Sequence, residues 1–106
     1  MSNRLSLYSI SEKLAQLSED YGSIYPKFRK LELEYVKEFD RLLMIAQNTF
    51  TNQPSREAYA RQEIAKLPIY EEFNNLSVEV RVIETQMRNL GQISRNLVSN
   101  NWQSEN

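Results

Sequence analysis

The chain contains no cysteine and no histidine. Without cysteine it has no disulfide, no thiolate metal site and no cysteine nucleophile. Without histidine it lacks the commonest general base and a common metal ligand. We therefore expect no metal, no cofactor and no enzymatic activity. The absence of cysteine is also typical of a cytoplasmic protein, which for a phage-encoded chain means the cytoplasm of the host cell.

Glycine and proline are also scarce, with two and three residues respectively among 106. So few turn residues exclude an all-β fold with many turns. Gly22 and Gly91 are too far apart to build a phosphate-binding glycine loop, and no nucleotide-binding, nucleophile-elbow or zinc-protease motif is present. These absences favour a single all-α domain over residues 1–106.

Long apolar runs are absent as well. No stretch of about 18 apolar residues occurs, so the sequence predicts no membrane-spanning segment and no membrane partner. The first eight residues contain no long apolar stretch, which predicts no secretory signal. The chain has 13 basic and 14 acidic residues and a net charge of -1. Any contact with nucleic acid must therefore come from a local basic patch.

The most informative feature that is present is a repeating apolar pattern near the C-terminus. Apolar residues recur there at intervals of three and four, at Phe73, Leu76, Val80, Ile83, Met87, Leu90 and Leu97. Because a helix turns about 100° per residue, these positions form one narrow seam, as in a coiled coil. A single helix cannot keep such a seam in water. The seam therefore requires a partner helix, from this chain or from another copy.

Capping and proline signals divide the first half of the chain into two helices. Ser9 and Glu12 have the capping-box spacing and predict a short helix over residues 9–21. Gly22 and Pro26 predict a break, followed by a long helix over residues 24–50.

The second half contains two further helices. Pro54 should stop the long helix, and Ser55 is the expected N-cap of a connecting helix over residues 55–67. Pro68 should end that helix, and the heptad helix then covers residues 69–100, followed by a frayed polar tail over 101–106 that contains Trp102. The predicted architecture is a long antiparallel, coiled-coil-like helical hairpin that forms homo-oligomers.

A set of cations lies along one flank of the heptad helix and just before it. Its members are Arg81, Arg88 and Arg95, spaced by seven, with Arg61 and Lys66 earlier in the chain. Guanidinium groups about 10 Å apart along a helix can follow a nucleic-acid backbone and release its counterions. The alternative interpretation is a solvated flank that pairs with Glu84 and with carboxylates of the facing helix.

Aromatic residues gather beside another group of cations. Tyr21, Tyr25, Phe28 and Tyr35 are interspersed with Lys27, Arg29 and Lys30. Bases stack on aromatic rings while cations hold the phosphates, so this pattern suits single-stranded nucleic acid. Phe28 and Tyr35 share the apolar face of their helix, which favours a core role for both. Tyr21 and Tyr25 are therefore the candidates for contact with a protein or a base, and Tyr25 is the one that we assign to nucleic acid.

The chain resembles phage recombination mediators of the UvsY type. The resemblance covers residues 24–100: a charged long helix with spaced aromatics, a polar turn with proline, the segment Arg56-Glu57-Ala58-Tyr59-Ala60-Arg61, and Tyr70-Glu71-Glu72-Phe73 leading into a heptad helix with regular arginines. It implies a mostly helical, self-assembling protein that binds single-stranded DNA and helps load a recombinase.

The basic Lys-Ala-Arg motif of that family has no counterpart in this chain, because residues 42–47 contain no basic residue. DNA contact is therefore expected from Arg81, Arg88, Arg95 and their neighbours. The competing hypothesis is a helical adaptor or inhibitor that binds only protein, either as a phage structural protein or against a host target. The net charge near zero motivates that hypothesis.

Overall fold

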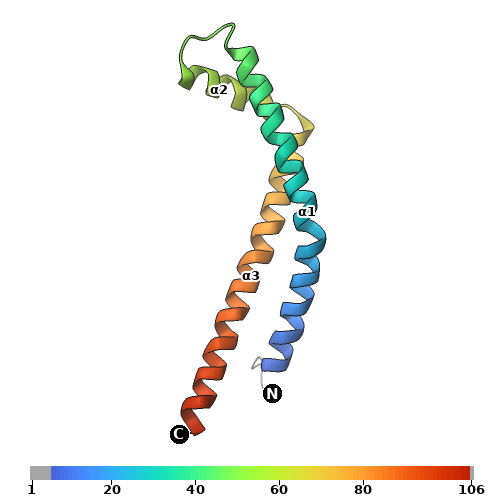
Figure 1. Cartoon of the computed structure of the whole chain (residues 1–106), viewed down its shortest axis with the longest axis vertical. Helices are drawn as coiled ribbons and strands as arrows, with labels where there is room; N and C mark the ends of the chain where they lie inside the picture. The colour runs from blue at the N-terminus through green and yellow to red at the C-terminus, as the bar shows by residue number, and fades with distance from the viewer. Residues whose placement is uncertain (1–5, 106) are drawn as a thin grey trace. The chain divides into compact units, whose positions relative to one another are not determined.

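The described part of the chain is helical apart from short connections between its helices. The computed structural model describes the backbone of residues 6–105 and the side chains of residues 6–100. This part contains α1 (Leu7–Ala46), α2 (Gln53–Ile64) and α3 (Pro68–Glu105), with no strand (Figure 1). The predicted all-α fold class is confirmed. The prediction of no secretory signal rests partly on residues 1–5, which lie outside the described residues.

Two compact units share these helices. The terminal unit contains the chain up to Ile24 and from Val80 onward, and the central unit is Tyr25–Glu79. Helices α1 and α3 each contribute to both units, whereas α2 belongs to the central unit alone. The expectation of a single domain over residues 1–106 stays a prediction.

The break predicted at Gly22 is wrong, because α1 is one helix with Pro26 inside it. Proline lacks an N–H, and its ring crowds the carbonyl four residues earlier, which belongs here to Gly22. Leu17 and Phe28 are both half-buried, one on each side of this point. Packing on both sides therefore outweighs the cost of an interior proline, about 3 kcal/mol. The glycine–proline signal instead marks the boundary between the two units, which falls between Ile24 and Tyr25.

The start of α1 also differs from the prediction, because Ser6 is its cap and not Ser9. The backbone N–H of Ser6 donates to Oγ of Ser9, and the N–H of Ser9 donates to Oγ of Ser6, each at 3.1 Å. This is a reciprocal capping box with serine in place of the usual glutamate. It starts the helix at Leu7 and leaves Glu12 outside the cap.

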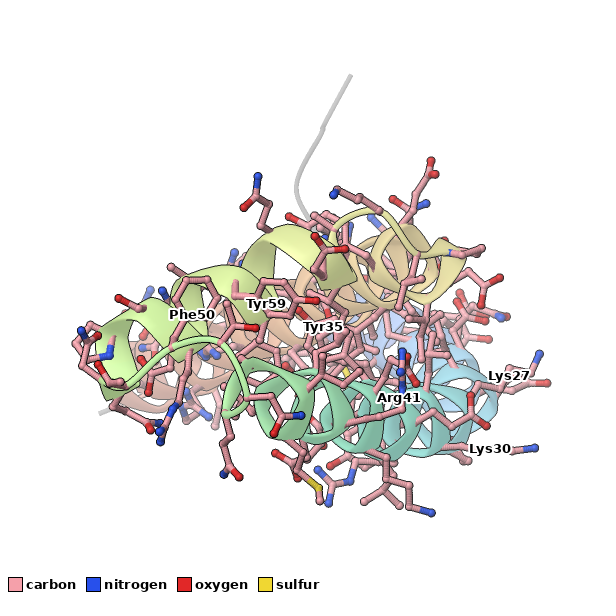
Figure 2. All side chains as sticks on the ribbon, turned by 90° about the horizontal axis from the view of Figure 1, so that it is seen from above. Lys27, Lys30, Tyr35, Arg41, Phe50 and Tyr59 are labelled. Atoms are coloured by element: carbon pink, nitrogen blue, oxygen red, sulfur yellow. The ribbon has the colours of Figure 1, made fainter. Side chains whose placement is uncertain are left out.

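The connection between α1 and α2 also differs in detail. Helix α1 ends at Ala46, and α2 begins two residues earlier than predicted because Asn52, and not Ser55, is its N-cap. Oδ1 of Asn52 accepts a hydrogen bond from the N–H of Ser55 at 2.9 Å, and Pro54 lies in the first turn, where its missing N–H is harmless. The ring of Phe50 lies 5.8 Å from that of Tyr59. Figure 2 shows the two residues side by side.

Helix α3 is longer than predicted at its C-terminal end. It begins at Pro68, a favourable residue for the first turn, and continues to Glu105, five residues beyond the predicted end at residue 100. After Gly91 the sequence contains neither glycine nor proline to stop it. Asn106 and the side chain of Trp102 lie outside the described residues.

The core of the central unit joins α1 to α2. Leu42, Ala60 and Ile64 are buried, with partly buried apolar residues around them at Tyr35, Phe39, Leu43 and Leu67. In the same unit the ring of Phe73 on α3 stacks against Tyr35 at 4.5 Å and against Phe28 at 5.7 Å. The interpretation of Phe28 and Tyr35 as packing residues is therefore confirmed.

Burial along α3 follows the predicted seam. Val80 is buried, and the other seam residues are half-buried: Phe73, Leu76, Ile83, Met87, Leu90 and Leu97. Ser94 and Gly91 are also half-buried, whereas most residues between the seam positions are exposed. In the terminal unit Ile10 of α1 is completely buried. The seam is thus partly covered within the chain itself.

Candidate nucleic-acid interface

The three heptad arginines lie in the terminal unit, on the part of α3 that points away from its seam. Arg81, Arg88 and Arg95 are all exposed, and at 1.5 Å per residue successive guanidiniums leave the helix at intervals of about 10 Å. We call the exposed surface around them the arginine face. Its members are Arg81, Val82, Thr85, Arg88, Asn89, Gln92, Arg95, Asn96 and Ser99.

Glu84 is exposed and lies one turn from both Arg81 and Arg88, but beyond it the arginine face carries no negative charge. Residues 85–100 contain no aspartate or glutamate, and the residues between the arginines offer mainly amide and hydroxyl groups. Glu84 is the nearest carboxylate in the sequence, and its Oε2 accepts a hydrogen bond from the Tyr21 hydroxyl at 2.9 Å. Tyr21 and Glu84 border a shallow hollow together with Met87 and Arg88.

The heptad arginines differ from four of the other cations in their pairing. Within residues 6–100 neither Arg81 nor Arg88 forms an ion pair with a carboxylate, and Arg95 donates from Nη2 to the uncharged Oε1 of Gln92 at 2.8 Å. Ion pairs with a carboxylate three or four residues away hold four other cations, in the pairs Arg29–Glu32, Arg41–Glu38, Arg61–Glu57 and Lys66–Glu63. The alternative interpretation, in which Glu84 neutralises the arginine flank, therefore lacks its expected ion pair in this part of the chain.

A groove opens beside the arginine face in the same unit. Leu17 of α1 and Leu90 of α3 contribute its apolar part, and its volume is about 420 Å³. The polar lining consists of Lys13, Gln16, Gln86 and Asn89. Asn89 belongs to both the groove and the arginine face, so the two surfaces are continuous. Sequence reasoning missed Lys13 and Gln16, because only the packing of α1 on α3 brings them close to Asn89.

The remaining predicted contact residues belong to the central unit. Arg61 and Lys66 are exposed but ion-paired, to Glu57 at 3.2 Å and to Glu63 at 3.0 Å. Tyr25 is half-buried, and its ring lies 6.1 Å from that of Phe28. The predicted set is thus divided between two units, and only the heptad arginines form one surface.

Two further lysines project from α1 in the central unit. Figure 2 shows Lys27 and Lys30 extending outward from the helix, away from Tyr35. They line a hollow of about 290 Å³ together with Leu31, Glu34 and Leu76. The carboxylate of Glu34 in that hollow makes it less suited to phosphate than the arginine face.

Other kinds of site find no support in residues 6–100. No group of three or more acidic side chains there is placed to hold a metal ion. No helix in the described part of the chain is both long and apolar enough to cross a bilayer. Comparisons with models of protein families, with curated proteins and with solved structures gave no match.

Proposed function

We propose that this chain is a non-enzymatic, self-associating accessory protein of phage or mobile-element DNA recombination, which binds single-stranded DNA and helps load a recombinase. The observation that carries the proposal is the arginine face, where three exposed guanidiniums lie on one helix. Two of them, Arg88 and Arg95, lie within residues 85–100, which contain no carboxylate. The resemblance to recombination mediators of the UvsY type motivates the biological role.

The chemistry of the arginine face suits a nucleic-acid strand. Guanidinium groups bind phosphate oxygens through two parallel hydrogen bonds, and each contact releases counterions from the strand. Asn89, Gln92 and Asn96 carry amides, which can donate to and accept from base edges. The adjoining groove between Leu17 and Leu90 offers an apolar surface to an unstacked base. An unstacked base is available in a single strand but not in a duplex, which favours single-stranded DNA.

The proposal includes an antiparallel, coiled-coil-like hairpin of α1 and α3. Tyr21 of α1 bonds to Glu84 of α3, whereas Leu17, one turn earlier on α1, shares its groove with Leu90, further along α3. As the residue number falls along α1, the number of the neighbouring residue on α3 rises, which supports antiparallel helices. The hairpin covers part of the seam internally, and the proposal places self-association on surface outside the seam, so that the arginine face stays open to DNA.

Fluorescence anisotropy with a labelled oligonucleotide tests the DNA-binding part. We expect binding at low ionic strength that weakens as salt is added, and stronger binding to a single strand than to the matching duplex. The absence of salt-sensitive binding at low ionic strength, at any protein concentration tested, rules the proposal out. Light scattering with and without the oligonucleotide reports self-association in the same samples.

One observation favours the competing function of a protein-binding adaptor or inhibitor. Val82 lies on the arginine face with 48% of its surface exposed, and the net charge of the chain is -1. Apolar side chains among cations also suit a protein partner. A pull-down from host lysate after nuclease treatment separates the two functions. An abundant retained protein, together with no oligonucleotide binding, favours the adaptor.

A further inference from the structure

The outward side of α1 in the central unit carries exposed apolar residues. Leu33, Val36 and Met44 are 58%, 49% and 68% exposed, whereas Leu42 and Ala46 are buried on the opposite side of the helix. Leu33 and Met44 are eleven residues apart and so point in directions within about 20° of each other. These residues form a continuous surface along about three turns of helix.

Two opposite charges lie within this surface. Lys37 and Asp40 are exposed, and neither forms an ion pair with another side chain of residues 6–100. Arg41, next to Asp40, is instead paired with Glu38. We call the surface made of Leu33, Val36, Lys37, Asp40 and Met44 the α1 outer face.

The α1 outer face is complementary to itself. When two copies of α1 lie antiparallel with their centres between Glu38 and Phe39, Leu33 of each copy meets Met44 of the other. In the same arrangement Lys37 of each copy meets Asp40 of the other. The two-fold symmetry thus makes two apolar contacts and two attractive charge contacts from one short segment.

We infer that the α1 outer face is the self-association surface of the protein, and that its partner is the same face of a second copy in antiparallel orientation. Charge complementarity supports a second copy as the occupant, because a lysine and an aspartate at symmetric positions neutralise each other when the face pairs with itself. The surface is short, so the dimer is weak and its population depends on concentration. The inference names the surface for the self-association in the proposed function, and it does not depend on DNA binding.

Charge reversals at Lys37 and Asp40 give a sharp test by light scattering over a concentration series. Lys37→Glu alone and Asp40→Lys alone each place like charges opposite one another twice, so each variant should dimerise about tenfold or more weakly than wild type. An equimolar mixture of the two variants restores attraction at both contacts, so it should form a heterodimer as readily as wild type forms its dimer. The double variant Lys37→Glu/Asp40→Lys should also recover the homodimer.

Glu34→Lys is the matched control, because Glu34 is exposed but lies about 100° around the helix from Leu33. It should leave dimerisation unchanged, and circular dichroism should show the same helix content in every variant. If wild type self-associates but the single reversals do so equally well, the α1 outer face is not the interface. If wild type stays monomeric at all concentrations, self-association itself is wrong, and the oligonucleotide titration still decides DNA binding separately.

Discussion

Replacing Arg88 with glutamine tests the arginine face most directly. Arg88 is the middle of the three heptad arginines, is exposed, and has no carboxylate partner among residues 6–100. Its removal therefore takes away one phosphate contact without freeing an acidic side chain. Arg41→Gln is the matched control, since it makes the same change at an arginine that is ion-paired to Glu38 on α1.

The expected effect follows from counterion release. For single strands the logarithm of the association constant falls with the logarithm of the salt concentration with a slope of about -0.7 per phosphate contact. Three arginine contacts give a slope of about -2.1, so affinity falls about 18-fold between about 50 and 200 mM salt. With Arg88→Gln the slope becomes about -1.4, and the fall over the same range is about 7-fold.

Anisotropy titrations of wild type, Arg88→Gln and Arg41→Gln at four or more salt concentrations measure these slopes. We expect parallel lines for wild type and Arg41→Gln and a shallower line for Arg88→Gln. The reasoning is refuted if Arg88→Gln retains the wild-type slope, or if Arg41→Gln reduces it as much. A wild-type slope near zero means that phosphate contacts do not drive binding at all.

Three further predictions concern the fold. Ile64→Ala removes a side chain that is 1% exposed in the central core; it should lower the free energy of unfolding by about 2–5 kcal/mol in urea denaturation, and a loss below 1 kcal/mol would contradict that core. Asn52→Ala removes the cap on the N–H of Ser55 and should lower the free energy of unfolding by about 1 kcal/mol. Asn52→Asp should retain most of the stability. The Arg41 side chain lowers the pKa of Glu38 below 4.5 through a hydrogen bond, so this contact stabilises the fold above that pH and is lost as pH falls through the folded-state pKa. Thermal melts should show wild type more stable than Glu38→Gln at neutral pH and the two converging in acid; a constant difference down to acid would exclude the linkage.

Several features of the fold could be predicted because they depend on periodicity along one helix. The spacing of three and four residues from Phe73 to Leu97 predicted which side of α3 is buried. The same spacing placed the arginines together on one flank of the helix, beside the seam. These inferences need only the helical repeat, which no contact with another segment alters.

Features that depend on packing between segments could not be predicted in this way. Local signals at Gly22 and Pro26 predicted a break, but burial on both sides keeps α1 continuous. Ser6 and Ser9 both fit a cap, and only the hydrogen bonds between them decide where α1 starts. The groove beside the arginine face was missed because Lys13 and Asn89 are far apart in the sequence and their approach carries no local signal.

The proline inside α1 has a consequence for how the protein opens. Pro26 has no amide hydrogen, so the carbonyl of Gly22 lacks its usual donor and one backbone hydrogen bond of the helix is missing there. The missing hydrogen bond lies at the boundary between the units. Local unfolding that starts at either end of α1 can therefore stop there. Amide exchange should therefore report two levels of protection along a single uninterrupted helix, one on each side of residue 26.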